Sequence, residues 1–179
     1  MPVDLARLYD DHAAALFGYA VNLTRREADA RDVLQEVFRR VASRPQLMDG
    51  VRSERAFLLR LAHNQAIDLM RRRTTREKTG ESAAGEGSEG HPFAASTRAD
   101  EEGFRRALAA ALAELPAEQR AVAHLKLWEQ LTFEEIAELL DISPNTAASR
   151  YRYAIDKLRA QLRPLYNEIK SPWTTSSNS

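Results

Sequence analysis

Residues 131–155 read LTFEEIAELLDISPNTAASRYRYAI, and this stretch begins with a clear helix start signal. Thr132 and Glu135 have the spacing of a capping box, which predicts a first helix starting at Phe133. Apolar residues then recur at three- and four-residue steps, at Phe133, Ile136, Ala137 and Leu140. One side of this helix is therefore expected to be buried and the other to face solvent.

A second helix is predicted directly after a short turn at Asp141 and Ile142. Ser143 stands at the N-cap position, and Pro144 stands at the first helical position, where a proline loses no hydrogen bond. Two helices joined by so short a turn cross steeply. The stretch is therefore predicted to form a helix-turn-helix.

The second helix has two faces of different chemistry. Its apolar face carries Ala147, Tyr151, Ala154, Ile155 and Leu158, and its polar face carries Asn145, Thr146, Ser149, Arg152 and Tyr153. Polar donors and acceptors near the N-terminus of such a helix read base edges in the major groove of DNA. Arg150, Lys157 and Arg159 flank this face as candidate phosphate contacts. The alternative is an ordinary helical hairpin with a solvated polar face.

Composition predicts an all-helical protein without disulfides. The 179-residue chain has no cysteine and only seven glycines and seven prolines, while Leu, Ala, Arg and Glu are abundant. The absence of cysteine excludes thiolate metal sites and gives no reason to expect an oxidising compartment. No apolar run approaches the roughly 18 residues of a membrane span, and the N-terminus does not resemble a signal peptide. We therefore expect a soluble cytoplasmic protein with no membrane insertion.

The formal net charge of +0 is unusual for a nucleic-acid-binding protein, but the charges are segregated along the chain. Positive charge gathers in the middle, at Arg52, Arg55, Arg60, Arg71, Arg72, Arg73 and Arg76. Negative charge follows, at Glu77, Glu81, Glu86, Glu89, Asp100, Glu101 and Glu102. Because binding depends on local potential rather than on the total, this pattern is consistent with DNA binding.

The N-terminal part is predicted to contain three helices. A long apolar stripe predicts the first over residues 4–23, and a second apparent capping box, Thr24 with Glu27, predicts the next over 25–42. Ser53 is expected to cap a third helix that ends near Arg73. Polar residues at helical spacing form a net basic ridge on that helix, at Arg60, Asn64, Asp68 and Arg71.

The pattern predicts two small helical domains joined by a flexible acidic linker. The domains are expected over residues 1–73 and 103–163, the linker over 74–102, and a disordered tail over 164–179. Glycines, serines and acidic residues in the linker bury too little surface to offset the entropy of ordering. In the second domain an alanine-rich helix should end before Pro116, and another should start at that proline and lead to the helix-turn-helix.

Taken in order, these segments resemble the sigma-70 family of RNA polymerase sigma factors, in its compact extracytoplasmic-function (ECF) class. The resemblance rests on residues 29–38 (DARDVLQEVF), on residues 55–73 (RAFLLRLAHNQAIDLMRRR) and on the stretch from Leu115 to Arg159. Together with the linker it covers nearly all of the chain except the last dozen or so residues. It implies a sigma-2-like bundle, a sigma-4-like helix-turn-helix domain and a role in transcription initiation.

The resemblance also implies residue roles. Core RNA polymerase would bind Asp32, Gln35 and Glu36. The opened −10 promoter strand would bind Asn64, Asp68, Arg71 and Arg72. The −35 element would bind Asn145, Thr146, Ser149, Arg150, Arg152 and Tyr153. The loop over residues 45–52 corresponds to the segment that captures a flipped base. Core polymerase and promoter DNA are therefore the expected partners, and the sequence leaves open whether an anti-sigma factor is another.

Two residues depart from the family pattern. Asp141 stands where the turn commonly has glycine, although aspartate tolerates a left-handed backbone better than most residues. Ala148 stands where a basic residue is usual, so one DNA contact is missing. We therefore make no prediction of the −35 sequence.

Other functions explain less of the sequence. Asp10, Asp11 and His12 invite a metal hypothesis, but successive helical residues point about 100° apart, and no other histidine has ligand spacing. We therefore expect no enzyme activity, metal or cofactor. A helix-turn-helix regulator that acts without polymerase would leave the basic ridge and the Asp32 face without a role. A helical scaffold would leave the polar face after Asn145 unexplained.

Overall fold

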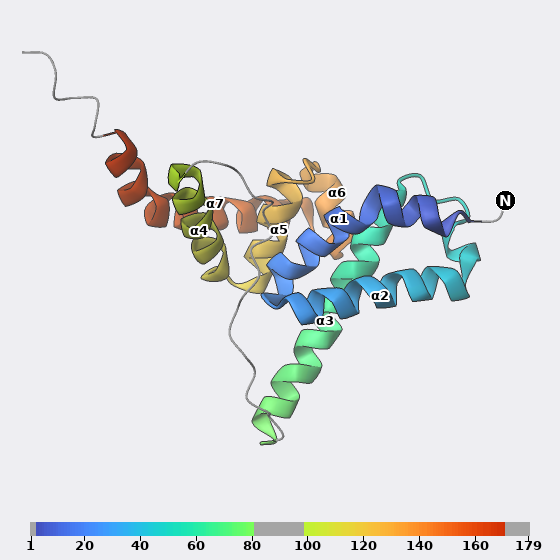
Figure 1. Ribbon diagram of the computed structural model, residues 1–179. Coiled ribbons are helices and arrows are strands. Elements are labelled where there is room, and N and C mark those ends of the chain that lie inside the picture. Colours follow the sequence, from blue (N-terminus) through green and yellow to red (C-terminus); the bar gives the residue numbers. More distant parts are fainter. Residues whose placement is uncertain (1–2, 81–98, 171–179) are drawn as a thin grey trace, which may run out of the picture.

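A computed structural model describes residues 3–80 and 99–170, and those residues form an all-helical protein. Its elements are α1 (Leu5–Thr24), α2 (Glu27–Ser43), a 3-10 turn η1 (Pro45–Met48), α3 (Glu54–Lys78), α4 (Ala99–Ala113), α5 (Ala117–Leu127), α6 (Phe133–Leu140) and α7 (Pro144–Lys170). The predicted fold class is confirmed, since the described segments contain two helical domains and no strand. Figure 1 shows α1–α3 on one side, α4 and α7 on the other, and α5 and α6 between them.

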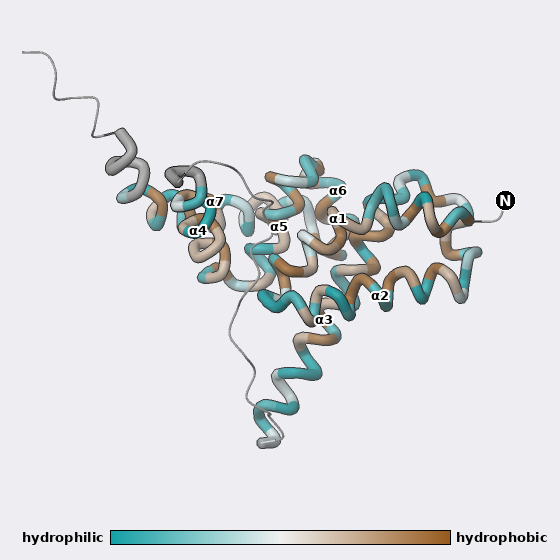
Figure 2. The backbone as a smooth tube through the Cα atoms, viewed as in Figure 1, coloured by the Kyte–Doolittle hydropathy of each residue, from teal (hydrophilic) through white to brown (hydrophobic). Residues whose placement is uncertain are grey.

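The first domain is a bundle in which α1, α2 and α3 pack on one another. Its core is formed by fully buried side chains that recur at helical spacing, including Leu8, Leu16, Tyr19, Val33, Val37, Leu58 and Leu59. The C-terminal half of α3 leaves the bundle and projects from the body of the molecule (Figure 1). That projecting half is mostly hydrophilic (Figure 2), so it presents its side chains to solvent.

Local caps set most helix starts in this domain, but one predicted cap is wrong. Ser53 accepts a hydrogen bond from the backbone nitrogen of Ala56 at 3.2 Å and starts α3, as predicted. The capping box predicted at Thr24 and Glu27 does not form. Thr24 is instead the last residue of α1, and its hydroxyl donates to the carbonyl of Ala20 at 2.8 Å. The same hydroxyl also donates to the carbonyl of Arg26, the N-cap residue of α2, at 3.1 Å, so it links the end of α1 to the start of α2 without forming a capping box.

Helix α3 continues past Arg73 to Lys78, into the segment predicted as linker. The hydroxyls of Thr74 and Thr75 donate to carbonyls four residues earlier, and Arg73 forms an ion pair with Glu77 at 2.8 Å. These contacts join neighbouring turns and supply local support where apolar packing has ended. Residues 81–98 of the predicted linker lie outside the described residues.

In the second domain, α4 and α5 both pack against α7. Buried apolar side chains join these helices, at Ala111, Leu112, Leu115, Ala123, Ala154 and Leu158. Pro116 is the N-cap residue of α5, so the helix starts at Ala117, one residue later than predicted. Helix α7 continues through Pro164 to Lys170, although the sequence predicted a tail from that proline. A proline inside a helix removes one backbone hydrogen bond, and α7 continues past Pro164 despite this loss.

The two domains pack against each other through α1 with α5 and through α3 with α6. One cluster of buried side chains runs through both domains, from Leu16 and Leu58 to Val122, Leu125 and Ile136. The predicted modules therefore share a core in this arrangement. Within residues 3–80 and 99–170, no helix is both long and apolar enough to cross a membrane.

Candidate nucleic-acid interface

The helix-turn-helix forms at the predicted positions. Thr132 and Glu135 make a reciprocal capping box at the start of α6. Asp141 ends α6 in the left-handed region, with φ 56° and ψ 51°, as expected of the residue that replaces glycine. Ser143 then accepts a hydrogen bond from the backbone nitrogen of Thr146 at 3.0 Å and starts α7. The apolar face of α7 turns inward, because Ala147 and Ala154 are completely buried.

All the predicted −35 contacts lie within the first ten residues of α7. Asn145, Arg152 and Tyr153 are exposed, and Tyr153 retains 64% of its accessible surface. Thr146, Ser149 and Arg150 are half-buried. Exposed aromatic, guanidinium and amide side chains of this kind are able to contact base edges and phosphates.

Arg150 has a partner within its own domain. Its guanidinium lies 2.8 Å from the carboxylate of Glu118 on α5, and the Arg150 side chain is 26% exposed. A phosphate that binds Arg150 therefore has to replace this carboxylate, so its contribution to DNA binding is reduced by the loss of the ion pair.

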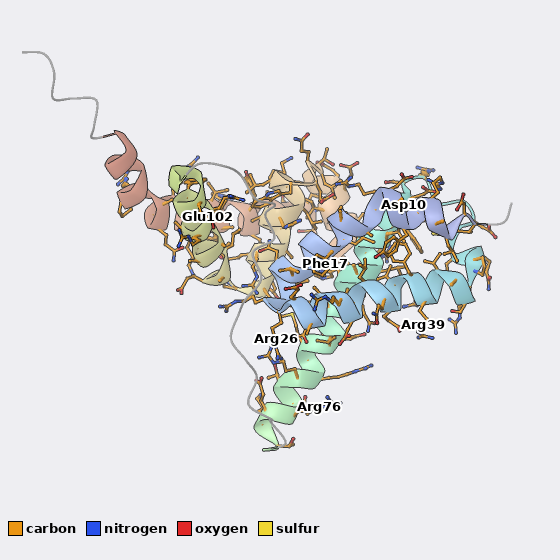
Figure 3. The ribbon with its side chains drawn as sticks, in the orientation of Figure 1. Asp10, Phe17, Arg26, Arg39, Arg76 and Glu102 are labelled. Atoms are coloured by element: carbon orange, nitrogen blue, oxygen red, sulfur yellow. The ribbon has the colours of Figure 1, made fainter. Side chains whose placement is uncertain are left out.

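The predicted −10 contacts all lie on one exposed stretch of α3. Asn64, Asp68, Arg71 and Arg72 are exposed and lie in the middle and C-terminal part of α3. Figure 3 shows Arg76 on the projecting end, one turn beyond them. Because the side chains of this half face solvent, the ridge is accessible to a single strand of DNA.

The predicted polymerase contacts lie on the outer side of α2. Asp32 and Gln35 are exposed, and Glu36 is half-buried. Glu36 forms a two-point ion pair with Arg39, at 2.7 and 2.8 Å, and this hydrogen bonding holds the pKa of the Glu36 carboxyl below its usual value. The charge of Arg72 on α3 lowers the same pKa further. Because α2 and α3 pack on each other, the predicted polymerase face and the predicted −10 ridge lie on adjacent helices.

Sequence reasoning missed a group of polar residues between the two domains. Arg120 is 4% exposed, and its guanidinium donates to the carbonyl of Leu23 on α1 at 3.1 Å and to carbonyls at the end of α4. Asn22 on α1 donates to Nδ1 of His124 on α5 at 2.9 Å. The only sequence signal for this group is a polar residue on the inward side of an otherwise apolar helix, as at Arg120 and His124.

The carboxylate of Glu129 joins the same interdomain group. Its side chain is 3% exposed and lies 2.5 Å from Nε of Arg55 on α3 and 3.8 Å from Nε2 of His124. Burial opposes ionisation of Glu129, but hydrogen bonds to His124 and Arg55 outweigh burial and hold the pKa of this carboxyl below its usual value. The ion pair between Glu129 and Arg55 therefore stays charged at neutral pH.

His63 on α3 is half-buried, and its protonation makes stability depend on pH. Its Nδ1 shares a hydrogen bond with the hydroxyl of Tyr19 at 2.8 Å. Burial, with a further contribution from the charge of Arg150, lowers the pKa of His63 to about 4. Because this pKa is below that of the unfolded chain, stability is present above about pH 6.5 and is lost as the pH falls toward 4.

We expect the unfolding free energy to fall by about 2 kcal/mol more in the wild type than in His63→Gln between pH 7 and pH 4.5. Glutamine remains neutral, so the difference isolates the histidine from the carboxylates that titrate in the same range. Urea denaturation at the two pH values measures it. An equal pH dependence in both proteins would show that His63 can be protonated without loss of packing.

Within the described segments, no group of three or more histidine, aspartate or glutamate side chains is arranged to hold a metal ion. In the Asp10, Asp11 and His12 cluster, Asp11 and His12 lie near charged side chains of other turns and helices. Asp11 forms an ion pair with Arg7 at 3.1 Å, and His12 lies 3.6 Å from Glu54.

Comparisons with known proteins agree with this arrangement. The family model described as Sigma-70 region 2 matches residues 8–76, and the model described as Sigma-70, region 4 matches residues 105–158. The chain is 36% identical over 160 residues to the ECF RNA polymerase sigma factor SigL of Mycobacterium tuberculosis, with 88% of each protein covered. The chain belongs to the sigma-70 family. It is an ECF sigma factor that directs promoter-specific transcription initiation, and it is not an enzyme.

The chain is also similar to other sigma factors. RNA polymerase sigma factor CarQ of Myxococcus xanthus is 31% identical over 163 residues, which cover 90% of this chain and 91% of CarQ. A similar fold occurs in the sigma factor RpoE of Bartonella quintana, solved in complex with the anti-sigma factor NepR, with a TM-score of 0.70 and 22% identity. That match covers 83% of this sigma factor and 90% of RpoE.

Proposed function

We propose that the α1–α3 domain of this sigma factor binds core RNA polymerase and holds the opened −10 strand, while α7 reads the −35 duplex. The observation that carries this proposal is that the outer face of α2 adjoins the exposed ridge of α3. A strand bound along Asn64 to Arg72 would lie directly beside polymerase docked on Asp32 and Gln35. Polymerase supplies the catalytic metals, and the sigma factor positions polymerase on the promoter.

The polymerase face is assigned to Asp32, Gln35 and Glu36, and the −10 ridge to Asn64, Asp68, Arg71 and Arg72. The arginines suit phosphate and stacked bases, whereas Asp68, whose carboxylate repels phosphate, would orient its basic neighbours. The −35 face is assigned to Asn145, Thr146, Ser149, Arg150, Arg152 and Tyr153. Its exposed members can enter a major groove without any rearrangement of α7.

We expect Arg152→Ala to weaken discrimination between a matched and a −35-scrambled promoter by about 1–3 kcal/mol, or roughly 5- to 150-fold. Run-off transcription with core polymerase and this sigma factor measures the discrimination. Arg159→Ala is the matched control, because an exposed phosphate contact farther along α7 should lower transcription from both promoters equally. Equal transcription from the two promoters by the wild type would refute the −35 assignment.

The same assay distinguishes this function from that of a regulator that acts alone. A sigma factor gives promoter-specific transcripts only when core polymerase is present, and its free form binds DNA weakly because each domain offers a small contact area. Tight and specific duplex binding by the purified chain, without any effect on polymerase, would favour the regulator.

We further propose that the protein acts in the cytoplasm, where polymerase meets promoter DNA, and that an anti-sigma factor is an additional partner. The second proposal is supported by the fold shared with RpoE, which was solved with NepR. Co-purification of the tagged chain from its native cell tests it, and recovery with core polymerase alone would argue against it.

A further inference from the structure

The projecting end of α3 carries an exposed threonine directly after a run of arginines. Residues 71–75 read RRRTT, so Thr75 has Arg72 and Arg73 three and two positions before it. Among the described residues, no carboxylate lies within ion-pair distance of Arg71 or Arg72. Protein kinases select substrates by charge patterns, and a kinase with an acidic substrate groove would recognise a basic run of this kind.

Thr75 is accessible because the end of α3 packs on little else. Every residue from 74 to 80 is exposed, and this part of the helix is mostly hydrophilic (Figure 2). The Thr75 hydroxyl donates to the carbonyl of Arg71 at 3.1 Å, so a kinase reaches it only when the last turns of the helix open. Helix ends with few buried contacts open at small cost. Thr75 can therefore enter an active site while the rest of the domain stays folded.

Thr75 lies on the same face of α3 as the −10 ridge. At about 100° per residue, it is turned only about 20° from Asn64 and from Asp68 around the helix axis. Helical side chains lean toward the N-terminus, where Arg71 and Arg72 precede Thr75 by four and three residues. A phosphate on Thr75 would therefore meet the two arginines that are assigned to the DNA strand.

Phosphorylation at this position would replace DNA on the ridge. A phosphothreonine carries about −1.5 to −2 charges at pH 7 and three acceptor oxygens. It would form charge-assisted hydrogen bonds with Arg71 and Arg72, in the way that a phosphate of DNA does. The two guanidiniums would then be neutralised, and any remaining negative charge would repel the DNA backbone.

We propose that Thr75 is a phosphorylation site for an arginine-directed serine/threonine kinase, and that the phosphate blocks binding of the −10 strand. The kinase transfers the γ-phosphoryl group of ATP to Oγ1 of Thr75. The new O–P bond forms as the bond from the γ-phosphorus to the β,γ-bridging oxygen breaks, the hydroxyl proton passes to a carboxylate of the kinase, and ADP leaves. This inference rests on the proposed function, since it assumes that the opened −10 strand binds the α3 ridge.

The site is tested by incubating the full chain with ATP and a soluble extract of its native cell, followed by phosphopeptide mass spectrometry. We expect phosphate on Thr75. Arg72→Gln removes the arginine three positions before the acceptor and should slow the reaction about tenfold, the value of one charge-assisted hydrogen bond. Absence of phosphate from Thr75, or modification of Thr74 or Thr79 alone, would overturn the inference.

The effect on DNA is measured with the phosphorylated protein assembled on core polymerase. A fluorescent single strand that carries the −10 element of a transcribed promoter is titrated with this holoenzyme at several salt concentrations. We expect the dissociation constant to rise at least about tenfold, because two guanidiniums are no longer available to the strand. The log–log slope against salt should become shallower by about 1.4, at about 0.7 for each lost single-strand contact. Phosphatase treatment should reverse both changes.

Thr75→Glu and Thr79→Glu form a matched pair of substitutions. Both place one carboxylate on the exposed end of α3, but Thr79 lies one turn beyond the ridge, and its neighbour in the preceding turn is Arg76. We expect Thr75→Glu to weaken single-strand binding and Thr79→Glu to bind within about twofold of the wild type. Equal weakening by both would show that the position of the charge does not matter and would overturn the inference.

The unmodified holoenzyme separates this inference from the function on which it rests. If it does not bind the −10 strand, the proposed function fails. If the unmodified and the phosphorylated holoenzymes bind the strand equally, only the phosphorylation inference fails.

Discussion

Replacing both Asp32 and Glu36 with lysine is expected to abolish binding to core RNA polymerase while helix content stays unchanged. Both side chains lie on the outer side of α2, and neither contributes to the buried core. Reversal of two charges at a complementary interface leaves like charges in contact, and loss of a buried interfacial charge pair weakens binding by about 2–5 kcal/mol. Dissociation constants should therefore rise by at least about 30-fold.

The measurement is a pull-down of core polymerase with tagged sigma factor, followed by titration of the complex. Asp10→Lys/Asp49→Lys is the matched control, because it changes the charge equally at two exposed positions of the same domain. The control should bind polymerase as the wild type does. Normal holoenzyme assembly by the Asp32 and Glu36 variant would show that α2 is not the docking surface.

Glu36 needs one further consideration, because Arg39 already holds its carboxylate. The Arg39 side chain is 70% exposed, so the ion pair is weak and polymerase can replace it at small cost. Arg39→Ala should consequently preserve or strengthen binding. Figure 3 shows Arg39 on the outer side of α2, where a docked partner would meet it.

Arg120→Ala is expected to destabilise the protein by about 3–5 kcal/mol, the largest stability effect of any single substitution considered. The guanidinium satisfies carbonyls at the ends of two helices, including that of Leu23 on α1 and that of Ala113 on α4. Burial, with the nearby charge of Arg25, lowers the pKa of Arg120 to about 10, so the side chain stays charged at neutral pH. Without it, several buried carbonyls lose their donor.

Urea denaturation at pH 7 measures this loss, and Arg163→Ala is the matched control because its side chain is exposed near the end of α7. The control should change stability by less than about 0.5 kcal/mol. Arg120→Lys should recover only part of the loss, since an ammonium cannot span the same carbonyls as a planar guanidinium. A loss below about 1 kcal/mol in Arg120→Ala would indicate that water replaces the guanidinium.

The sequence alone determined the local structure, including the helix-turn-helix. Thr132, Glu135 and Ser143 act on backbone groups within three residues, and the apolar repeat in α7 depends only on helical geometry. Apolar repeats of the same kind indicated which side chains would face outward on α2, α3 and α7. The local signal failed at Thr24, because its hydroxyl bonds the carbonyls of Ala20 and Arg26 and forms no capping box with Glu27.

The tertiary structure alone decided how the two domains meet. Arg120 bonds to a carbonyl 97 residues earlier, and His124 to an asparagine 102 residues earlier. Such partners have no fixed spacing in the sequence, because they depend on how whole helices pack rather than on the turn of one helix. A buried arginine in an apolar helix indicates that the side chain has a hydrogen-bond partner, but only the packed fold shows which group that partner is.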